Sequence, residues 1–177
     1  ASQPTATPVA AQPTATPVAP QPTATPTAVT VPFPVTKVLD AYNRANGAVG
    51  TNWSGSTSGY RVASQRLDIG STRDIYWKAT KFGANQEAYV TLATIDGAAT
   101  QMGLLLKSQS NSTYTSGTIE VLYSPTEGNV QLWTYTAASG WVRNATTFKV
   151  TFANGDKLGV RAYASGPVVV FRNGSPL

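Results

Sequence analysis

The segment from residue 130 to residue 141 combines aromatic rings with amide side chains. Trp133 and Tyr135 are two positions apart, which places both rings on one face of a strand. Aromatic faces that stack on the C–H surface of a sugar ring, with amides beside them to orient it, are typical of glycan-binding sites. The segment therefore predicts a glycan-binding platform, whose expected members are Trp133, Tyr135, Trp141, Gln131 and Asn144.

The aromatic residues also have a structural interpretation, because large rings fill protein cores. Trp133 and Tyr135 fit either role, so both interpretations stay open for them. Trp53 and Trp77 are expected to pack in the core of the domain.

The acidic residues are isolated along the chain, which bears on catalysis. Glycoside hydrolysis needs two carboxylates that face one sugar, and none of the 8 Asp and Glu residues has a partner at short spacing. The chain contains no His and no Cys, which excludes imidazole bases, thiolate nucleophiles, His or Cys zinc sites and disulfides. We expect a protein without enzymatic activity, and an acid pair assembled from separate strands is the alternative.

The basic residues are dispersed, although the formal net charge is +5. Nucleic-acid binding requires clustered cations that displace counterions from phosphates. Single Lys and Arg residues among neutral ones are typical of solvated strand faces, so no specific nucleic-acid partner is expected. No apolar run approaches the roughly 18 residues that span a bilayer, and no transmembrane segment is predicted.

The first 34 residues differ in composition from the rest of the chain. They hold nine of the 12 prolines, and within them the element Gln-Pro-Thr-Ala-Thr-Pro occurs three times at a nine-residue period. Dense proline removes backbone donors and favours polyproline II, so residues 1–34 are expected to form an extended stalk. Threonines beside prolines are typical of O-glycosylated stalks, and an unmodified linker is the alternative. The candidate glycosylation sites are Thr5, Thr7, Thr14, Thr16, Thr23 and Thr25.

Residues 35–177 have the pattern of a β-sheet domain. Short apolar runs alternate with polar residues at period two, and Gly, Asn, Ser or Asp clusters separate them roughly every 8 to 12 residues. The expected strands are residues 60–63, 66–69, 75–80, 88–95, 102–108, 118–123, 130–136, 148–152, 157–163 and 168–172. So many antiparallel strands in one domain imply two packed sheets. Strand parity assigns to the core Val90, Leu92, Met102, Leu104, Leu106, Leu158 and Val160.

The first residues of this domain carry a resemblance to a known family. Residues 39–53 read Leu-Asp-Ala-Tyr-Asn-Arg-Ala-Asn-Gly-Ala-Val-Gly-Thr-Asn-Trp, which resembles the aromatic-x-Arg-Ala-Asp/Asn-Gly-x-x-Gly-x-x-Trp start of concanavalin A-like and laminin G-like jelly-roll domains of bacterial extracellular proteins. Residues 103–107, 119–123, 131–135 and 155–162 are similar to successive strands of that family, and residues 168–174 to its closing Asn-Gly hairpin. The resemblance covers residues 38–177. It implies a two-sheet antiparallel jelly-roll sandwich in a secreted or cell-surface protein.

The resemblance also bears on glycoside hydrolysis and on Ca²⁺ binding. Hydrolases of this fold carry Glu-x-Asp-x-x-Glu on one strand, and that string does not occur in this sequence. Related lectin-like domains bind Ca²⁺ through Asp and Asn oxygens. The candidates here are Asp40, Asn43, Asn46 and Asp68. The alternative is a turn at Asn46, with Arg44 and Trp53 tying this segment to the core.

Family members continue with further strands after the Asn-Gly hairpin, whereas this sequence stops at Leu177. The resemblance therefore implies a sheet with a vacant edge. An unpaired edge invites a strand from another chain, and a truncated fragment is the other explanation.

Two hypotheses of function follow from these features. In the first, the protein is a noncatalytic module that binds a polysaccharide or cell-surface glycan and is displayed on the stalk. In the second, it is a structural subunit of an extracellular filament, in which the arm of one copy docks on the incomplete sheet of the next. The arm residues expected at that contact are Val29, Val31, Phe33 and Val35.

Overall fold

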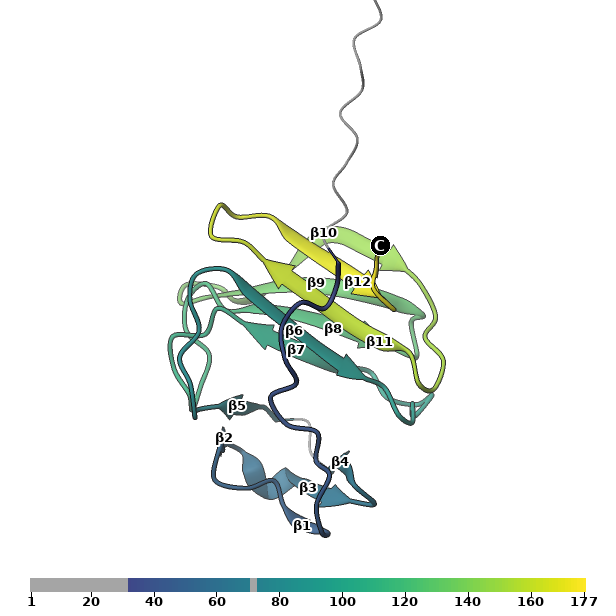
Figure 1. Cartoon of the computed structure of the whole chain (residues 1–177). Helices are drawn as coiled ribbons and strands as arrows, with labels where there is room; N and C mark the ends of the chain where they lie inside the picture. Colours follow the sequence, from purple (N-terminus) through teal and green to yellow (C-terminus); the bar gives the residue numbers. More distant parts are fainter. Residues whose placement is uncertain (1–31, 71–72) are drawn as a thin grey trace, which may run out of the picture. The chain divides into compact units, whose positions relative to one another are not determined.

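The computed structural model describes residues 32–70 and 73–177 of the chain (Figure 1). These residues form β-strands and one 3-10 helix, η1 (Thr57–Gly59), and they include no α-helix. The strands are β1 (Gly47–Ala48), β2 (Trp53–Gly55), β3 (Tyr60–Ala63), β4 (Arg66–Ile69), β5 (Ile75–Trp77), β6 (Gln86–Thr91), β7 (Met102–Leu106), β8 (Ile119–Ser124), β9 (Asn129–Thr136), β10 (Gly140–Lys149), β11 (Lys157–Ala162), β12 (Val168–Arg172) and β13 (Ser175–Pro176). The expectation of an all-β domain is confirmed. The candidate glycosylation sites from Thr5 to Thr25 and the arm residues Val29 and Val31 lie outside the described residues.

The strands form four antiparallel sheets. Two have four strands each, in the orders β10-β9-β8-β7 and β13-β12-β11-β6. The other two are small, with the orders β1-β3-β4 and β2-β5. Short turns join β3 to β4, β9 to β10 and β12 to β13 as antiparallel hairpins, whereas β6 pairs with β11 and β2 with β5, which are not neighbours in the chain.

The two four-stranded sheets share one hydrophobic core, which gives this part of the chain a β-sandwich character (Figure 1). The sheet β10-β9-β8-β7 contributes Leu106, Val121, Tyr123 and Val130, and the sheet β13-β12-β11-β6 contributes Leu158, Val160, Ala162 and Val170. The face assignments made from strand parity hold for Leu92, Leu106, Leu158 and Val160, which are all buried, and Met102 and Leu104 pack against the core. Val90 was also expected in the core, but it is 36% exposed. The Tyr123 hydroxyl accepts a hydrogen bond from the Phe152 backbone N–H at 3.2 Å, so this polar atom of the core is satisfied.

Strand β10 differs from the expectation. The sequence predicts a strand at residues 148–152, whereas β10 spans Gly140–Lys149 and pairs with β9 along most of its length. A register shift between Arg143 and Thr147 interrupts the pairing. The residues between them do not alternate apolar with polar side chains, so the sequence lacks the period-two pattern that predicts a strand. Pairing with β9 forms the strand there in spite of the weak local pattern.

The C-terminal residues also form a strand that was not expected. After the Asn173-Gly174 turn, β13 pairs with β12 through Phe171 and Arg172, and the Leu177 N–H donates to the Val170 carbonyl at 2.9 Å. The sheet edge beside these residues of β12 is therefore occupied by the chain itself.

The two tryptophans expected in the core lie outside it. Trp53 on β2 and Trp77 on β5 are half-buried and pack edge to face, with ring centroids 5.2 Å apart, and Tyr42 stacks on Trp53 at 6.2 Å. Neither tryptophan belongs to the core of the two large sheets. The reason is that β2 and β5 pair only with each other, so their aromatic residues form a separate small cluster.

Residues 32–36, which we call the strap, lie across the outer face of the sheet β13-β12-β11-β6 (Figure 1). The Phe33 ring stacks on Phe171 of β12 at a centroid distance of 4.0 Å, and the Thr36 hydroxyl donates to the Glu87 carboxylate of β6 at 2.7 Å. One compact unit spans residues 32–177. The last three residues that the sequence assigned to the stalk, residues 32–34, therefore pack with the β-sheet domain.

Candidate functional site

The outer face of the sheet β10-β9-β8-β7 carries most of the residues expected to bind a glycan. Side chains that alternate with the buried Val130 on β9 project from this face, as do their cross-strand partners on β10. We call this surface the aromatic face, formed by Gln131, Trp133, Tyr135, Trp141 and Arg143. Trp133 and Tyr135 are half-buried, so the strand spacing on which their prediction rested places them outside the main core.

The Trp133 ring is held in one orientation by a chain of hydrogen bonds. Its indole Nε1 donates to Gln131 Oε1 at 3.0 Å. Gln131 in turn donates from Nε2 to Glu127 Oε2 at 2.9 Å and to Asn129 Oδ1 at 3.0 Å. Gln131 is only 3% exposed, so its amide is fixed by these partners. Trp133 therefore presents a preoriented ring, with its polar edge turned toward the protein.

Charged groups of both signs border this ring. The Arg143 guanidinium carbon lies 6.0 Å from the Trp133 ring centroid, and its Nη2 lies 3.7 Å from Glu127 Oε2. The hydrogen bond from Asn129, together with the hydrogen bond from Gln131 and the charge of Arg143, outweighs the opposing effect of burial and lowers the pKa of Glu127. Glu127 is therefore ionised at neutral pH. The ring has a hydrogen-bond donor and a hydrogen-bond acceptor beside it.

The other two aromatic residues of this face pack around a third ring. Tyr114, from the loop between β7 and β8, lies 5.0 Å from Tyr135 and 5.1 Å from Trp141, and the last two rings are 5.5 Å apart. Such tilted and edge-to-face contacts stabilise the arrangement. Sequence reasoning missed Tyr114, because a loop residue shares no strand period with Tyr135 or Trp141.

A half-buried acid lies next to the aromatic face. Glu120 on β8 is the cross-strand partner of Trp133, and burial, aided by the charge of Asp74, raises the pKa of its carboxyl to about 7. Burial also raises the pKa of Asp74. Gly103 on β7 leaves room for Glu120, since a Cβ at that position would lie 2.8 Å from Glu120 Oε1. The sequence shows Glu120 only as an isolated acid, because its surroundings come from separate segments of the chain.

Asn144 does not join the other expected residues. It lines, with Leu132 and Phe148, a pocket of about 320 Å³ on the core side of β9 and β10. Its Oδ1 accepts a hydrogen bond from the Thr146 N–H at 2.9 Å. Arg143 is the cross-strand partner of Trp133, so strand alternation places its neighbour Asn144 on the opposite face. The expectation that Asn144 belongs to the platform is not met.

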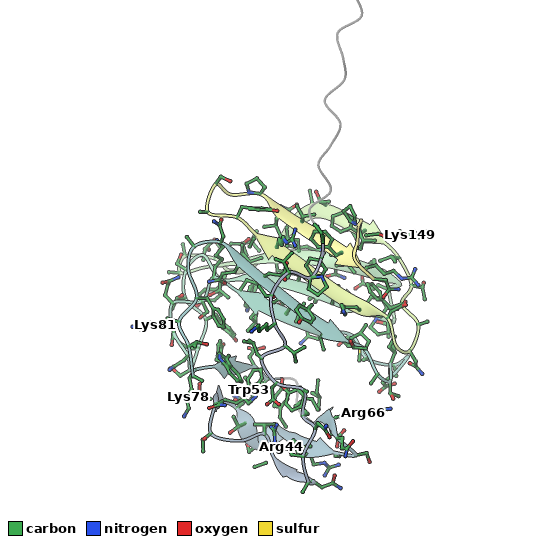
Figure 2. All side chains as sticks on the ribbon, in the orientation of Figure 1. Arg44, Trp53, Arg66, Lys78, Lys81 and Lys149 are labelled. Atoms are coloured by element: carbon green, nitrogen blue, oxygen red, sulfur yellow. The ribbon has the colours of Figure 1, made fainter. Side chains whose placement is uncertain are left out.

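The four residues proposed for calcium are not gathered into one site. Asp40 accepts hydrogen bonds from Arg44 at 2.6 Å and from the Trp53 indole at 3.0 Å, and Figure 2 shows these two residues in the same part of the chain. Burial alone would raise the pKa of Asp40, but the hydrogen bonds from Arg44, Trp53 and the Tyr42 backbone outweigh it and lower the pKa. Arg44 and Trp53 thus tie this segment together, but to the small aromatic cluster of β2 and β5 and not to the core, as the alternative interpretation expected.

The other calcium candidates bind other protein groups or are exposed. Asp68 pairs with Arg61 at 2.7 Å, and Asn46 Oδ1 accepts from the Ser64 N–H at 2.9 Å. Asn43 is exposed. Within residues 32–70 and 73–177 there is no group of three or more acidic side chains that would hold a metal ion. These residues do not fit a Ca²⁺ site.

Comparison of the chain with protein families, with curated proteins and with solved structures gives no match. The resemblance to concanavalin A-like domains therefore remains a prediction that rests on the sequence fragments. The part of the chain that the structure describes contains no helix with the length and apolar character to cross a membrane.

Proposed function

We propose that the protein is a noncatalytic module of the concanavalin A-like jelly-roll class that binds a glycan through the aromatic face. The observation that carries this proposal is the fixed Trp133 ring, whose Nε1 is held by Gln131 and whose border carries Arg143 and Glu127. The extracellular or cell-surface location implied by the family resemblance belongs to the same proposal.

The chemistry of this surface suits a sugar. A pyranose has an apolar C–H face and a rim of hydroxyls, so it gains from a flat ring with donors and acceptors next to it. Trp133 supplies the ring, Arg143 supplies donors and Glu127 supplies an acceptor. Because Gln131 already fixes the indole, little side-chain entropy is lost when a sugar binds.

The shape of the site favours a polymer over a small free sugar. The aromatic residues lie along two neighbouring strands, with Trp133 and Arg143 paired across them and Tyr135 paired with Trp141 further along. Consecutive sugar units of a polysaccharide can contact consecutive positions of such a surface. Stacking interactions of this kind are individually modest, so several contacts are needed for useful affinity.

A glycan array with the full chain tests the proposal, followed by titration of the best glycan. Trp133→Ala is expected to weaken binding about 10- to 100-fold, which corresponds to the loss of about 1.4 to 2.8 kcal/mol. Gln131→Met, which keeps the side-chain length but leaves the indole N–H without its acceptor, should weaken binding less. The matched control is Tyr163→Ala, because Tyr163 is 37% exposed and follows β11 in the other sheet.

Two results would contradict the proposal. One is the absence of binding to every glycan on the array by the folded chain. The other is equal affinity of Trp133→Ala and Tyr163→Ala for the bound glycan.

A further inference from the structure

The strap occupies a site on the outer face of the sheet β13-β12-β11-β6 that matches its shape. The Phe33 ring stacks on Phe171 at an interplanar angle of 11° and meets Tyr89 edge-on at a centroid distance of 6.2 Å. Gly159 on β11 lies under the same ring, and a Cβ at that position would overlap it. The absence of a side chain at position 159 is therefore required for Phe33 to bind.

Polar groups of the site hold the backbone of the strap. Glu87 Oε1 accepts hydrogen bonds from the backbone N–H groups of Val35 and Thr36, each at 2.9 Å. Arg161 donates to the Pro32 carbonyl, and the Tyr89 hydroxyl donates to the Thr36 carbonyl at 3.1 Å. Both ends of the strap are thus fixed by side chains of the sheet.

The two charged residues of this site also bind each other. Arg161 Nε lies 2.7 Å from Glu87 Oε2, and the side chains are 9% and 4% exposed. The Arg161 guanidinium also lies 5.2 Å from the Phe33 ring and 5.4 Å from the Phe171 ring. Since Glu87 and Arg161 neutralise each other, the site keeps its charge balance when the strap leaves. Such a site can release one strap and accept another.

The connector that follows the strap, residues 37–39, is suited to act as a hinge. Its side chains are exposed, with Val38 at 61% and Leu39 at 51%. No hydrogen bond or ion pair joins these three residues to the rest of the described chain. The chain is fixed again at Asp40, through Arg44 and Trp53. A free connector between two fixed points allows the strap to leave its own domain without disturbing the next segment.

We propose that this site accepts the strap of a second copy of the chain, so that copies join by strap exchange. Each contact that holds the strap is made to residues 32–36 alone, and every copy carries both the strap and the site. Exchange of an identical element is a low-cost route to assembly, because the contacts of the closed and exchanged states are the same. The exposed apolar side chains of Val35, Val38 and Leu39 gain a partner when two connectors meet.

A short connector also sets the balance between the two states. Closure within one chain competes at an effective concentration of about 1 mM, so exchange is favoured at high protein concentration or when closure is prevented. Two complementary full-length variants remove this competition. Gly159→Val keeps the strap but blocks the site, and Phe33→Ala keeps the site but removes the ring that anchors the strap.

Sedimentation velocity of the two variants, alone and in an equimolar mixture, measures the exchange. Each variant alone is expected to be a monomer, and the mixture is expected to form a heterodimer of twice the chain mass. A synthetic peptide of residues 30–38 should dissociate the heterodimer by competing for the vacant site. The matched control replaces Gly159→Val with Gly97→Ala, because a Cβ at position 97 meets no atom within 4 Å and the site of that chain stays occupied by its own strap. The control mixture should remain monomeric.

A mixture that stays monomeric at about 1 mM, with both variants folded by circular dichroism, would overturn the proposal. Should Gly159→Val fail to fold, deletion of Val38 and Leu39 from the otherwise unchanged chain decides the question. The shortened connector prevents closure within one chain, so this variant is expected to form dimers or longer assemblies. If it remains a folded monomer, the site does not accept a second strap.

Discussion

The carboxyls of three half-buried residues in this domain fall into two groups, with lowered or raised pKa, because their neighbours differ. Glu87 faces Arg161 and three donors from the strap, and these hydrogen bonds outweigh burial and lower its pKa. Asp40 is held in the same way by Arg44 and Trp53. Glu120 has no such cation and lies within the field of Asp74, so its pKa rises to about 7. Residue type alone does not separate these acids; their cross-strand and loop neighbours do.

The raised pKa of Glu120 predicts that the free energy of unfolding falls as pH rises from about 5 to 8. The unfolded chain releases this proton near pH 4.3, whereas the folded chain holds it until about pH 7, so ionisation between these values destabilises the fold. Glu120→Gln should therefore be more stable than the wild type at pH 8, by on the order of 2 kcal/mol. Urea denaturation at pH 5 and pH 8 measures this difference. A gain of the same size at both pH values would show that ionisation of Glu120 is not the cause.

Removal of the cation beside Glu87 should have the opposite dependence on pH. Arg161→Met leaves the Glu87 charge without its ion-pair partner and is expected to lower the free energy of unfolding by about 3 kcal/mol at pH 7. The folded-state pKa of Glu87 is lowered, so its stabilising contribution is present above the unfolded pKa near 4.3 and is lost as pH falls below that value. The difference between variant and wild type should thus shrink at pH 3. Denaturant titrations at pH 7 and pH 3 provide the comparison, and an unchanged difference would contradict this account.

At the scale of elements, the small sheets depend on side chains that reach across loops. β2 and β5 have only three residues each, too few for a stable hairpin by themselves. Asp40 ties the preceding segment to Trp53 of β2, and Ser54 of β2 donates to the Asn111 carbonyl of the loop between β7 and β8 at 2.5 Å. These contacts, more than strand length, hold the element in place.

Asp40→Ala is expected to loosen this element while leaving the sandwich intact. The loss of the carboxylate leaves the Trp53 indole without its acceptor and leaves Arg44 with only the Val49 carbonyl, with an effect of about 1–3 kcal/mol that is confined to residues 40–55. Hydrogen exchange followed by mass spectrometry should show faster exchange there and little change in β8 or β11. Asp68→Ala is the control, since its pair with Arg61 has side-chain exposures of 44% and 73% and contributes at most about 1 kcal/mol. Equal effects of the two substitutions would argue against an anchoring role for Asp40.

The strands were predictable where period-two alternation and turn residues agree. β3, β4 and β12 have the bounds that the sequence predicts. β10 was largely missed, because its middle residues lack alternation and only pairing with β9 defines the strand. β1, β2 and β13 are too short to leave a period in the sequence. Asn144 was misplaced because adjacent residues of a strand point to opposite faces, so Asn144 lies on the core side while Arg143, the partner of Trp133, lies on the outer face.

For the molecule as a whole, composition predicted a boundary between stalk and domain after residue 34. In the structure, the contacts of residues 32–34 with the sheet place this boundary earlier. Proline density predicts an extended arm up to residue 34, but Phe33 finds a stacking partner in Phe171 and a gap above Gly159. Neither partner is near Phe33 in the sequence. The aromatic face, in contrast, could be predicted from local sequence. Gln131, Trp133 and Tyr135 alternate along a single strand, so the sequence alone places them on one face.

Truncation at two points tests whether the strap belongs to the folded unit. A chain that starts at Pro32 should retain the melting temperature of the full protein, whereas one that starts at Lys37 should melt several degrees lower, because it loses the contacts of Phe33 and Thr36. Differential scanning calorimetry of both chains makes the comparison. Equal melting temperatures would mean that the strap contributes little to stability.

The strap and the aromatic face lie on opposite outer faces of the β-sandwich. A partner bound to one face therefore does not cover the other. If copies are joined through their straps, each added copy presents one more Trp133 to the same polymer, and weak individual contacts combine into avidity. Affinity for a repetitive glycan would then be set by the number of linked copies, while specificity would remain with a single aromatic face.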